Sequence, residues 1–246
     1  MTGQIQSPDL DVLVVGGGLA ALRAAIAAAE SPGTRVGVAV KRKLGRSGSS
    51  ANTSAGYAVV FPEEGVEDHL ETHLRGKEQL TEDSTDVHFK DTMAGGGGVN
   101  DPQLVRIMCE EAPDRLQELL DWGVEMDVRQ GRLHKSPGGD HTFARTVGTK
   151  SHLGLDITSV LVRVALELGV EAYENCMVLE LLVSEGKIAG AVCLDRAKGE
   201  LLFLRAKTVI LAAGGCGRLF SWTSNPVDVT GDGFILAYRA GASLRD

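Results

Sequence analysis

The chain has 246 residues, of which 43% are hydrophobic and 24% are charged, and its formal net charge is −8. Such a composition is typical of a globular protein with one large or two small domains, and the acidic balance argues against binding to nucleic acid. The four cysteines have no metal-binding spacing, so we expect reduced thiols and a cytoplasmic protein. No secretory signal is evident, and the longest apolar run, Leu19–Ala29, is too short to span a bilayer.

A strand, a glycine cluster and a helix are predicted in succession over Asp11–Glu30. The apolar residues at its start do not alternate with polar ones, which favours a strand buried on both faces. The cluster Gly16-Gly17-Gly18 then predicts a tight turn, and the Ala- and Leu-rich stretch after it predicts a helix. The N-terminus of such a helix attracts anions, and the spacing Gly16-x-Gly18-x-x-Ala21 is typical of a dinucleotide-binding turn. A turn without a ligand is the less favoured alternative, because a second predicted strand, Val36–Val40, follows.

The residues after the second strand leave the identity of the dinucleotide open. An acidic residue usually stands there to hold a ribose, but this chain has Lys41-Arg42-Lys43. Basic residues suit the 2′-phosphate of NADP, and they also suit a dinucleotide that is held mainly by backbone atoms. The segment Leu44–Pro62 is rich in Ser, Gly and Asn. We expect it to cradle a diphosphate and line one face of a flat ring, and not to be a disordered linker.

Charged helices are predicted over Glu67–Lys77 and Asp86–Ala94. The first contains His69 and His73 at i, i+4 spacing, which metal ligands can have. No third ligand is evident, so we interpret this pair as part of a solvated helix face and predict no metal site.

A longer helix is predicted from the N-cap Asp101 to Gly123, kinked or divided at Pro113. The stretch Asp127–His152 is polar and irregular. A second amphipathic helix is then expected over Ile157–Leu168.

The pattern next changes to that of strands with short polar connections, which suit hairpins. These strands are Val170–Tyr173, Cys176–Val183, Ile188–Leu194 and Leu201–Arg205. We predict that they form an antiparallel meander set into an α/β protein. Thr208–Gly215 is predicted as a further buried strand, and Thr230-Gly-Asp-Gly233 leads into a last helix that ends at Ala240. No nucleophile elbow, P-loop or paired-carboxylate site is evident, so reaction and substrate stay open.

Five blocks of the chain resemble, in order, the flavoprotein subunit family of succinate dehydrogenase, fumarate reductase and L-aspartate oxidase. They are VVGGGLAALRAAIAA, RSGSSANTSAGYAVV, HFKDTMAGGGGVNDPQLVRIMCEEAPDRLQELLDWGVEMD, ARTVGTKSHLG and AAGGCGRLFSWTSNPVDVTGDGFILAYRAGASLRD. The last block is the most specific, because a strand, a double glycine, TGDG and an AGASLRD ending rarely coincide by chance. The resemblance implies an FAD-dependent oxidoreductase that moves a hydride between flavin and a small dicarboxylate, with amine oxidation of the L-aspartate oxidase type as an alternative.

For the fold, the resemblance implies a Rossmann-like α/β FAD-binding domain over residues 1–246. Its core would comprise residues 10–45 and 207–246, with a helical insertion at about 65–125 and a three-stranded antiparallel meander at about 170–206. The family keeps its substrate-binding residues C-terminal to a block like AGASLRD, and this chain stops at Asp246. We therefore expect the substrate-capping domain to be absent, the catalytic residues to be unknown, and an FAD-binding module without a complete active site to be the alternative to an enzyme.

The resemblance also implies which residues bind FAD. The glycine turn would hold the pyrophosphate, the basic pair after the second strand would lie near the adenosine ribose, and the Ser-rich segment would follow the diphosphate toward the isoalloxazine. The remaining residues would touch the adenine or close the pocket near the flavin. The expected cofactor-binding residues are Gly16, Gly17, Gly18, Leu19, Ala20, Ala21, Lys41, Arg42, Ser47, Ser49, Ser50, Ala51, Thr53, Ser54, Ala55, Gly56, Val178, Ala213, Gly214 and Asp232.

A non-covalent FAD is expected. Respiratory members of the family attach the cofactor through a histidine in a segment like S-H-T-x-x-A-x-G-G, and Ser50 takes the place of that histidine here. The family further implies a small dicarboxylate or amino-acid substrate. Its implied partner is an iron–sulfur or other electron-transfer protein. The implied location is the cytoplasm, or the inner face of the membrane through that partner.

Overall fold

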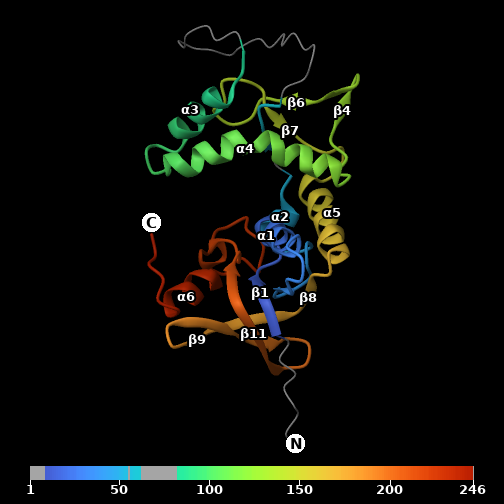
Figure 1. The fold of residues 1–246 in the computed structure, drawn as a ribbon. Coiled ribbons are helices and arrows are strands. Elements are labelled where there is room, and N and C mark those ends of the chain that lie inside the picture. Colours follow the sequence, from blue (N-terminus) through green and yellow to red (C-terminus); the bar gives the residue numbers. More distant parts are fainter. Residues whose placement is uncertain (1–8, 55, 62–81, 246) are drawn as a thin grey trace, which may run out of the picture. The chain divides into compact units, whose positions relative to one another are not determined.

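The structure is a computed structural model that describes residues 9–54, 56–61 and 82–245 (Figure 1). The chain divides into two compact units, unit 1 with Met1–Thr53 and Ile157–Asp246, and unit 2 with Ser54–Asp156. The predicted helix Glu67–Lys77, with its two histidines, lies outside the described residues, as does Ala55.

One six-stranded sheet forms the centre of unit 1. In spatial order its strands are β8 (Glu171–Tyr173), β2 (Val36–Ala39), β1 (Asp9–Val15), β11 (Glu200–Leu211), β10 (Lys187–Asp195) and β9 (Cys176–Ser184). The strand β1 pairs in parallel with both neighbours, so that Leu13 lies opposite Gly37 on one side and Val209 on the other. The first, second and last apolar strands of the sequence are therefore adjacent in the sheet.

The strand β11 differs from the prediction, because the two strands expected over Leu201–Arg205 and Thr208–Gly215 are one. Its first half pairs antiparallel with β10 and its second half pairs in parallel with β1, with Arg205 opposite Gly190 and Asp9. Ala206 and Lys207 are the residues that separate the two predicted strands. In the structure the exposed side chains of Arg205 and Lys207 form ion pairs with Asp9 and Asp11. The segment Glu171–Tyr173 is also reassigned, because it pairs in parallel with β2 and does not join the meander.

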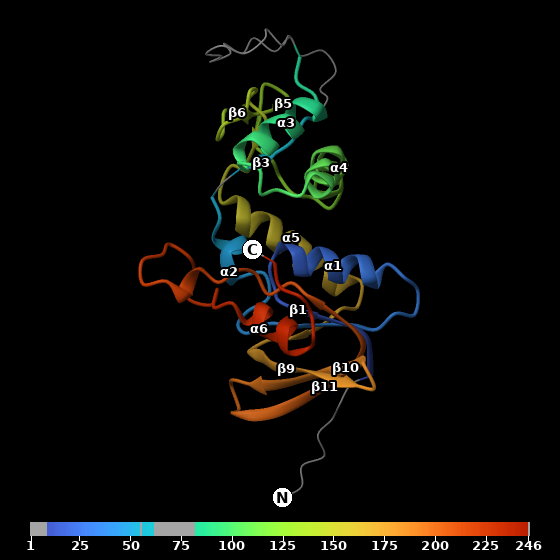
Figure 2. The same cartoon turned by 90° about the vertical axis from the view of Figure 1, so that its left-hand side faces the viewer.

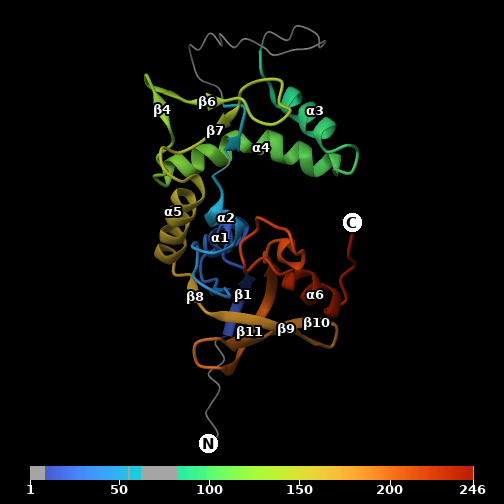
Figure 3. The same ribbon diagram turned by 180° about the vertical axis from the view of Figure 1, so that it is seen from behind.

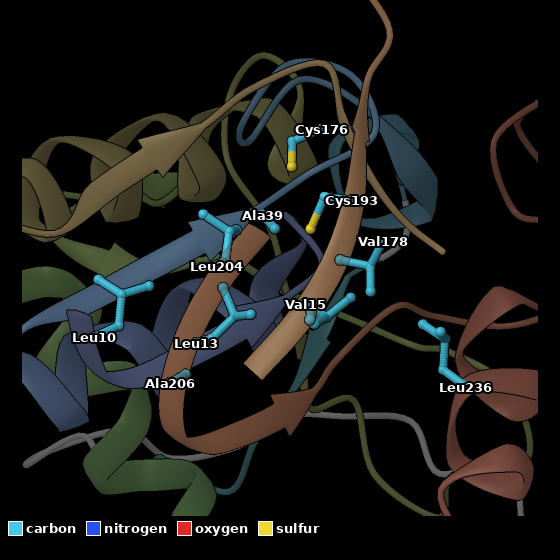
Figure 4. Packing of buried hydrophobic residues seen from close by; sticks show 11 residues of the cluster. Leu10, Leu13, Val15, Ala39, Cys176, Val178, Cys193, Leu204, Ala206 and Leu236 are labelled. Atoms are coloured by element: carbon cyan, nitrogen blue, oxygen red, sulfur yellow. The ribbon is translucent and has the colours of Figure 1, made fainter. Parts of the chain in front are cut away.

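The two faces of the parallel strands are covered by different elements. The helix α1 (Leu19–Ala29) buries Ala21, Leu22, Ala25 and Ile26, and it packs on β1 and β2. Figure 2 shows α1 on one side of β1 and the meander of β9, β10 and β11 on the other. Between the meander and β1 lies a hydrophobic cluster, in which Leu13, Val15, Val178 and Leu204 are buried (Figure 4). The meander therefore folds back over the parallel strands and closes the core.

Shorter helices complete unit 1. They are α2 (Gly48–Asn52), the 3-10 helix η1 (Gly217–Leu219) and α6 (Asp232–Arg239). The helix α5 spans Leu153–Glu167, so it begins four residues earlier than expected and crosses into unit 1 at Ile157. Within unit 1 the buried Thr158 hydroxyl donates to the Gly45 carbonyl at 2.7 Å, which attaches α5 to the loop after β2.

The described residues of unit 2 form the helices α3 (Thr85–Gly95) and α4 (Pro102–Asp121) and several short strands (Figure 3). The strands are β3 (Tyr57–Ala58), β4 (Val128–Arg129), β5 (Arg132–Leu133), β6 (Lys135–Ser136) and β7 (Thr146–Val147). Ser84 and Asp101 cap the two helices, since their side-chain oxygens accept N–H groups of the first turn. Pro113 does not divide α4, which is one helix of 20 residues. A proline costs a helix interior about 3 kcal/mol, and the buried apolar face of α4 offsets that cost.

A buried charge network stabilises unit 2. The side chain of Arg145 is fully buried and pairs with Asp83 at 2.5 Å and with Asp91 at 2.9 Å. Asp91 also accepts hydrogen bonds from the Thr142 backbone and hydroxyl. Desolvation by burial, with the nearby Arg145 charge, lowers the pKa of His88 to about 4. The network is thus held by two carboxylates on one guanidinium, with His88 neutral beside it.

Replacing Arg145 with Met should strongly destabilise unit 2, because it leaves two buried carboxylates without a counter-ion. We expect a loss of about 3–5 kcal/mol in the free energy of unfolding. Trp122 lies in unit 2 at the end of α4, so its fluorescence during urea denaturation reports this loss. The matched control is Arg129→Met, which removes an exposed ion pair with Asp127 in the same unit and should cost less than about 1 kcal/mol. Equal losses in the two variants would contradict the assignment.

Candidate cofactor-binding site

A cavity of about 250 Å³ lies in unit 1 at the carboxyl ends of β1, β2 and β11. Parallel strands end at the same edge of a sheet, and the helix that follows a strand begins there, so this is where α/β sheets bind ligands. The lining comes from the glycine turn, the end of β2, α2, the start of β9, the end of β11 and the start of α6. The fold thus brings together segments from both ends of the chain.

Glycine is required at the turn between β1 and α1. Gly16 has a φ of +128°, and an added Cβ would lie 2.2 Å from the Ala212 carbonyl oxygen at the end of β11. At Gly17 an added Cβ would lie 2.6 Å from a Val40 methyl group. The backbone therefore approaches its neighbours as closely as it can, and the floor of the cavity is bare main chain.

The N-terminus of α1 opens into this cavity. Gly18 is the N-cap residue and provides no side-chain cap, and the first turn carries no acidic residue. The Leu19 N–H donates to the Ser50 hydroxyl at 3.1 Å, so a side chain from α2 satisfies one of the free donors. The remaining N–H groups and the positive end of the helix dipole suit an anion such as a diphosphate.

The sides of the cavity are largely apolar. Val15, Val178 and Leu236 lie at one end of the hydrophobic cluster and also line the cavity (Figure 4). Cys176 lines it too, and a hydrogen bond from Cys193 lowers the pKa of its thiol. A glycine floor, an open helix N-terminus and apolar walls fit the pyrophosphate and adenosine portions of a dinucleotide.

Most of the residues predicted to bind the cofactor lie together in this cavity. They are Gly16, Gly17, Gly18, Ala20, Lys41, Ser47, Ser49, Ser50, Val178, Ala213, Gly214 and Asp232.

The other predicted residues lie elsewhere. Leu19 contributes its N–H, and Ala21 and Ala51 are buried without lining the cavity. Thr53 does not line it either. Arg42 lines an adjacent groove together with Arg46 and Arg196. Ser54 and Gly56 belong to unit 2, where they line a separate cavity with hydroxyl groups such as Thr146 and Ser151.

Several residues that line the cavity are not predicted from the sequence. They are Val15, Ala39, Val40, Gly48, Cys176, Ala212, Gly215, Asp228, Val229 and Leu236. Those that end a parallel strand could have been found, because the carboxyl ends of such strands form the site. Asp228 and Val229 carry no local signal, since only the packing of the loop before α6 brings them to the cavity.

Arg145 and His141 are polar residues of unit 2 that belong to its charge network. Arg145 directs its guanidinium to Asp83 and Asp91. The His141 ring packs on the His88 ring, with 5.4 Å between the centroids, and desolvation by burial lowers the pKa of His141. Both are therefore explained as parts of the structural network.

The described helices include none with the length and apolarity needed to cross a membrane.

Comparison with known proteins places the chain among flavoproteins. The model of the FAD binding domain family matches residues 11–246. A fumarate reductase (CoM/CoB) chain of Methanothermobacter marburgensis is 37% identical over 239 residues, which are 97% of this chain and 41% of the relative. The L-aspartate oxidase of Streptomyces coelicolor is 34% identical over 96% of this chain and 38% of its own length.

The solved structures agree with this relation. A quinol fumarate reductase chain of E. coli superimposes with a TM-score of 0.83 and 28% identity, over 95% of this chain and 37% of that chain. This confirms the expected α/β flavoprotein fold. The chain spans about 40% of the length of the relatives it matches. With a family match over nearly its whole length, the chain belongs to the FAD binding domain family of flavoprotein oxidoreductases.

Proposed function

We propose that this chain is the FAD-binding part of an oxidoreductase of the fumarate reductase and succinate dehydrogenase flavoprotein type. The observation that carries the proposal is the cavity at the N-terminus of α1, where glycines, hydroxyls and apolar residues from separate segments converge. When bound, FAD supplies the hydride chemistry. The names of the relatives, fumarate reductase and L-aspartate oxidase, suggest a small dicarboxylate or an amino acid as the substrate.

The protein's own residues would have separate tasks in this function. Gly16, Gly17 and Gly18 would let the diphosphate reach the backbone, and the N–H groups of α1 would bind its charge. Val178 and Leu236 would exclude water from the apolar part of the cofactor. The Ser50 hydroxyl, which accepts the Leu19 N–H, would hold the entrance of the helix in position.

A partner protein is part of the proposal. Relatives are named as subunits, among them a fumarate reductase flavoprotein subunit of Mycobacterium tuberculosis. We infer that an iron–sulfur or other electron-transfer protein exchanges electrons with the flavin of this protein. The cytoplasm, or the inner face of the membrane through that partner, is the proposed location.

A second candidate function is an FAD-binding module that does not turn over substrate by itself. It is favoured by the charges of the cavity, whose described lining includes neither arginine nor histidine. Lys41 is the cation of that lining. Its ammonium donates to Asp228 and Thr230 and forms an ion pair with Asp232, all within the chain. Nothing in the described cavity is therefore available to orient a dicarboxylate.

The purified chain should bind FAD and release it intact. No histidine is among the described residues that line the cavity, and Ser50 cannot form the histidyl bond of respiratory relatives. We expect the visible spectrum of a flavoprotein and, after acid or heat denaturation, free FAD in the supernatant with none on the chain. A chain that takes up no FAD would refute the proposed function. Flavin retained on the denatured chain would refute the non-covalent mode alone.

Replacing Gly18 with Val should abolish FAD binding and leave the secondary structure intact. The added Cβ would lie 2.7 Å from the Ser50 hydroxyl oxygen, in front of the helix N-terminus that the diphosphate must reach. Quenching of flavin fluorescence measures the binding, and circular dichroism measures the fold. The control is Gly95→Val at the end of α3, where an added Cβ meets no atom within 4 Å. Undiminished affinity in the Gly18 variant would mean that the ligand binds elsewhere.

The FAD-loaded chain, assayed alone, should show no significant turnover of fumarate, succinate or aspartate. Orienting a substrate over the flavin can lower a barrier by ~7–11 kcal/mol, and the described cavity offers no free cation to do so. Slow reoxidation of reduced flavin by oxygen needs no substrate pocket and should persist. Steady-state assays with the three substrates make the measurement. Rates within the ordinary enzyme range of about 1–10³ per second would instead show that the chain holds a complete active site.

A further inference from the structure

The feature that the proposed function leaves unexplained is the position of Lys41. It follows β2, where the sequence suggests a contact with a ribose or a 2′-phosphate. Its ammonium instead donates to the Asp228 carbonyl and the Thr230 hydroxyl, both at 2.7 Å, and forms an ion pair with Asp232 at 2.6 Å. An ammonium has three donors, and these partners use all three.

Both carboxylate oxygens of Asp232 also have partners within the chain. The Thr230 hydroxyl, which accepts from Lys41, donates to the other carboxylate oxygen of Asp232 at 2.8 Å. Both charged side chains are about one quarter exposed, so the pair is screened less than a surface ion pair. The two hydrogen bonds that Lys41 donates join the end of β2 to the loop directly before α6. Their acceptors lie 187 and 189 positions later in the chain.

The charges around the cavity show why this pair matters. Among the described lining residues, Lys41 is the one cation, and Asp228 and Asp232 line the cavity with it. The Lys41 ammonium pairs with the Asp232 carboxylate and contacts Asp228 through the backbone carbonyl. A dinucleotide brings a negatively charged diphosphate into the same space. Without Lys41, that charge would meet the uncompensated Asp232 carboxylate across a partly apolar cavity, where like charges repel more strongly than in water.

We propose that Lys41 is a positioning residue that makes the cavity electrostatically acceptable to the dinucleotide. It neutralises Asp232 and draws the Asp228–Asp232 loop against the end of β2, so that α6 closes the cavity. This inference rests on the proposed binding of FAD in this cavity. It assigns Lys41 a role different from reading a phosphate on the ribose, because its donors are already used within the chain.

The test is a set of FAD titrations, followed by flavin fluorescence, on the wild type and on Lys41→Met, Lys41→Arg and Asp232→Asn. Lys41→Met should weaken FAD binding by at least about tenfold, because it leaves the Asp232 carboxylate unpaired. Lys41→Arg keeps the charge and should recover most of the affinity. The double variant Lys41→Met/Asp232→Asn should lose less than the two single losses combined, since removing the carboxylate removes the repulsion.

The control is Lys207→Met, which breaks an ion pair with Asp11 on the same sheet but away from the cavity. It should bind FAD like the wild type. The loss in Lys41→Met should also shrink as salt is added, whereas a merely structural role would give a salt-independent loss. If the wild type binds FAD and Lys41→Met binds it equally well, or if the two single losses simply add, the role of Lys41 is overturned while the proposed function stands. If the wild type binds no FAD, the proposed function itself falls.

Discussion

The close approach of Gly16 to the end of β11 is the constraint on which the cofactor cavity depends. With 2.2 Å between an added Cβ and the Ala212 carbonyl oxygen, no side chain fits at this position. Because the turn is this tight, α1 begins directly at the edge of the sheet, and its free N–H groups face the cavity. Any larger residue would separate β1 from β11, and the floor of the cavity would then lose its backbone donors.

The local parts of this architecture are predictable from the sequence, and the reasons are physical. A short polar connection predicts the turn between β9 and β10, and Glu185 and Gly186 adopt the positive φ angles that a tight hairpin requires. The Asp101 cap and the glycine turn are predictable for the same kind of reason. Each of these signals is complete within a few residues, so no long-range contact is needed to interpret it.

The errors arise where tertiary contacts outweigh local preference. Pro113 predicts a kink or a division of α4, and the division does not occur, because burial of Cys109 and Leu116 on the same face keeps the helix continuous. The sequence predicts a break at Ala206 and Lys207, between two strands, yet pairing with β10 up to Arg205 and with β1 from Arg205 onward makes one strand. In the site, Asp228 is not predicted because its proximity to Lys41 depends on the packing of residues far apart in the sequence. The sequence indicates a basic residue after β2 but does not show that its partners lie within the chain.

Two cations in this protein illustrate how burial determines what a charged side chain does. Arg145 is fully enclosed and meets two carboxylates, so its charge is balanced within unit 2 and is not offered to a ligand. Lys41 is partly exposed and balances the Asp232 carboxylate in a cavity that opens to solvent.

In a chain with a net charge of −8, a site for an anionic cofactor cannot rely on the overall field of the protein. It must create a local region that favours negative charge. The N-terminus of α1 offers uncharged backbone donors, which would bind a diphosphate without requiring counter-ions. Lys41 completes the arrangement by cancelling a carboxylate that would oppose it. Attraction by the helix and neutralisation by the lysine are separate contributions, and the cavity needs both because Asp232 stands within it.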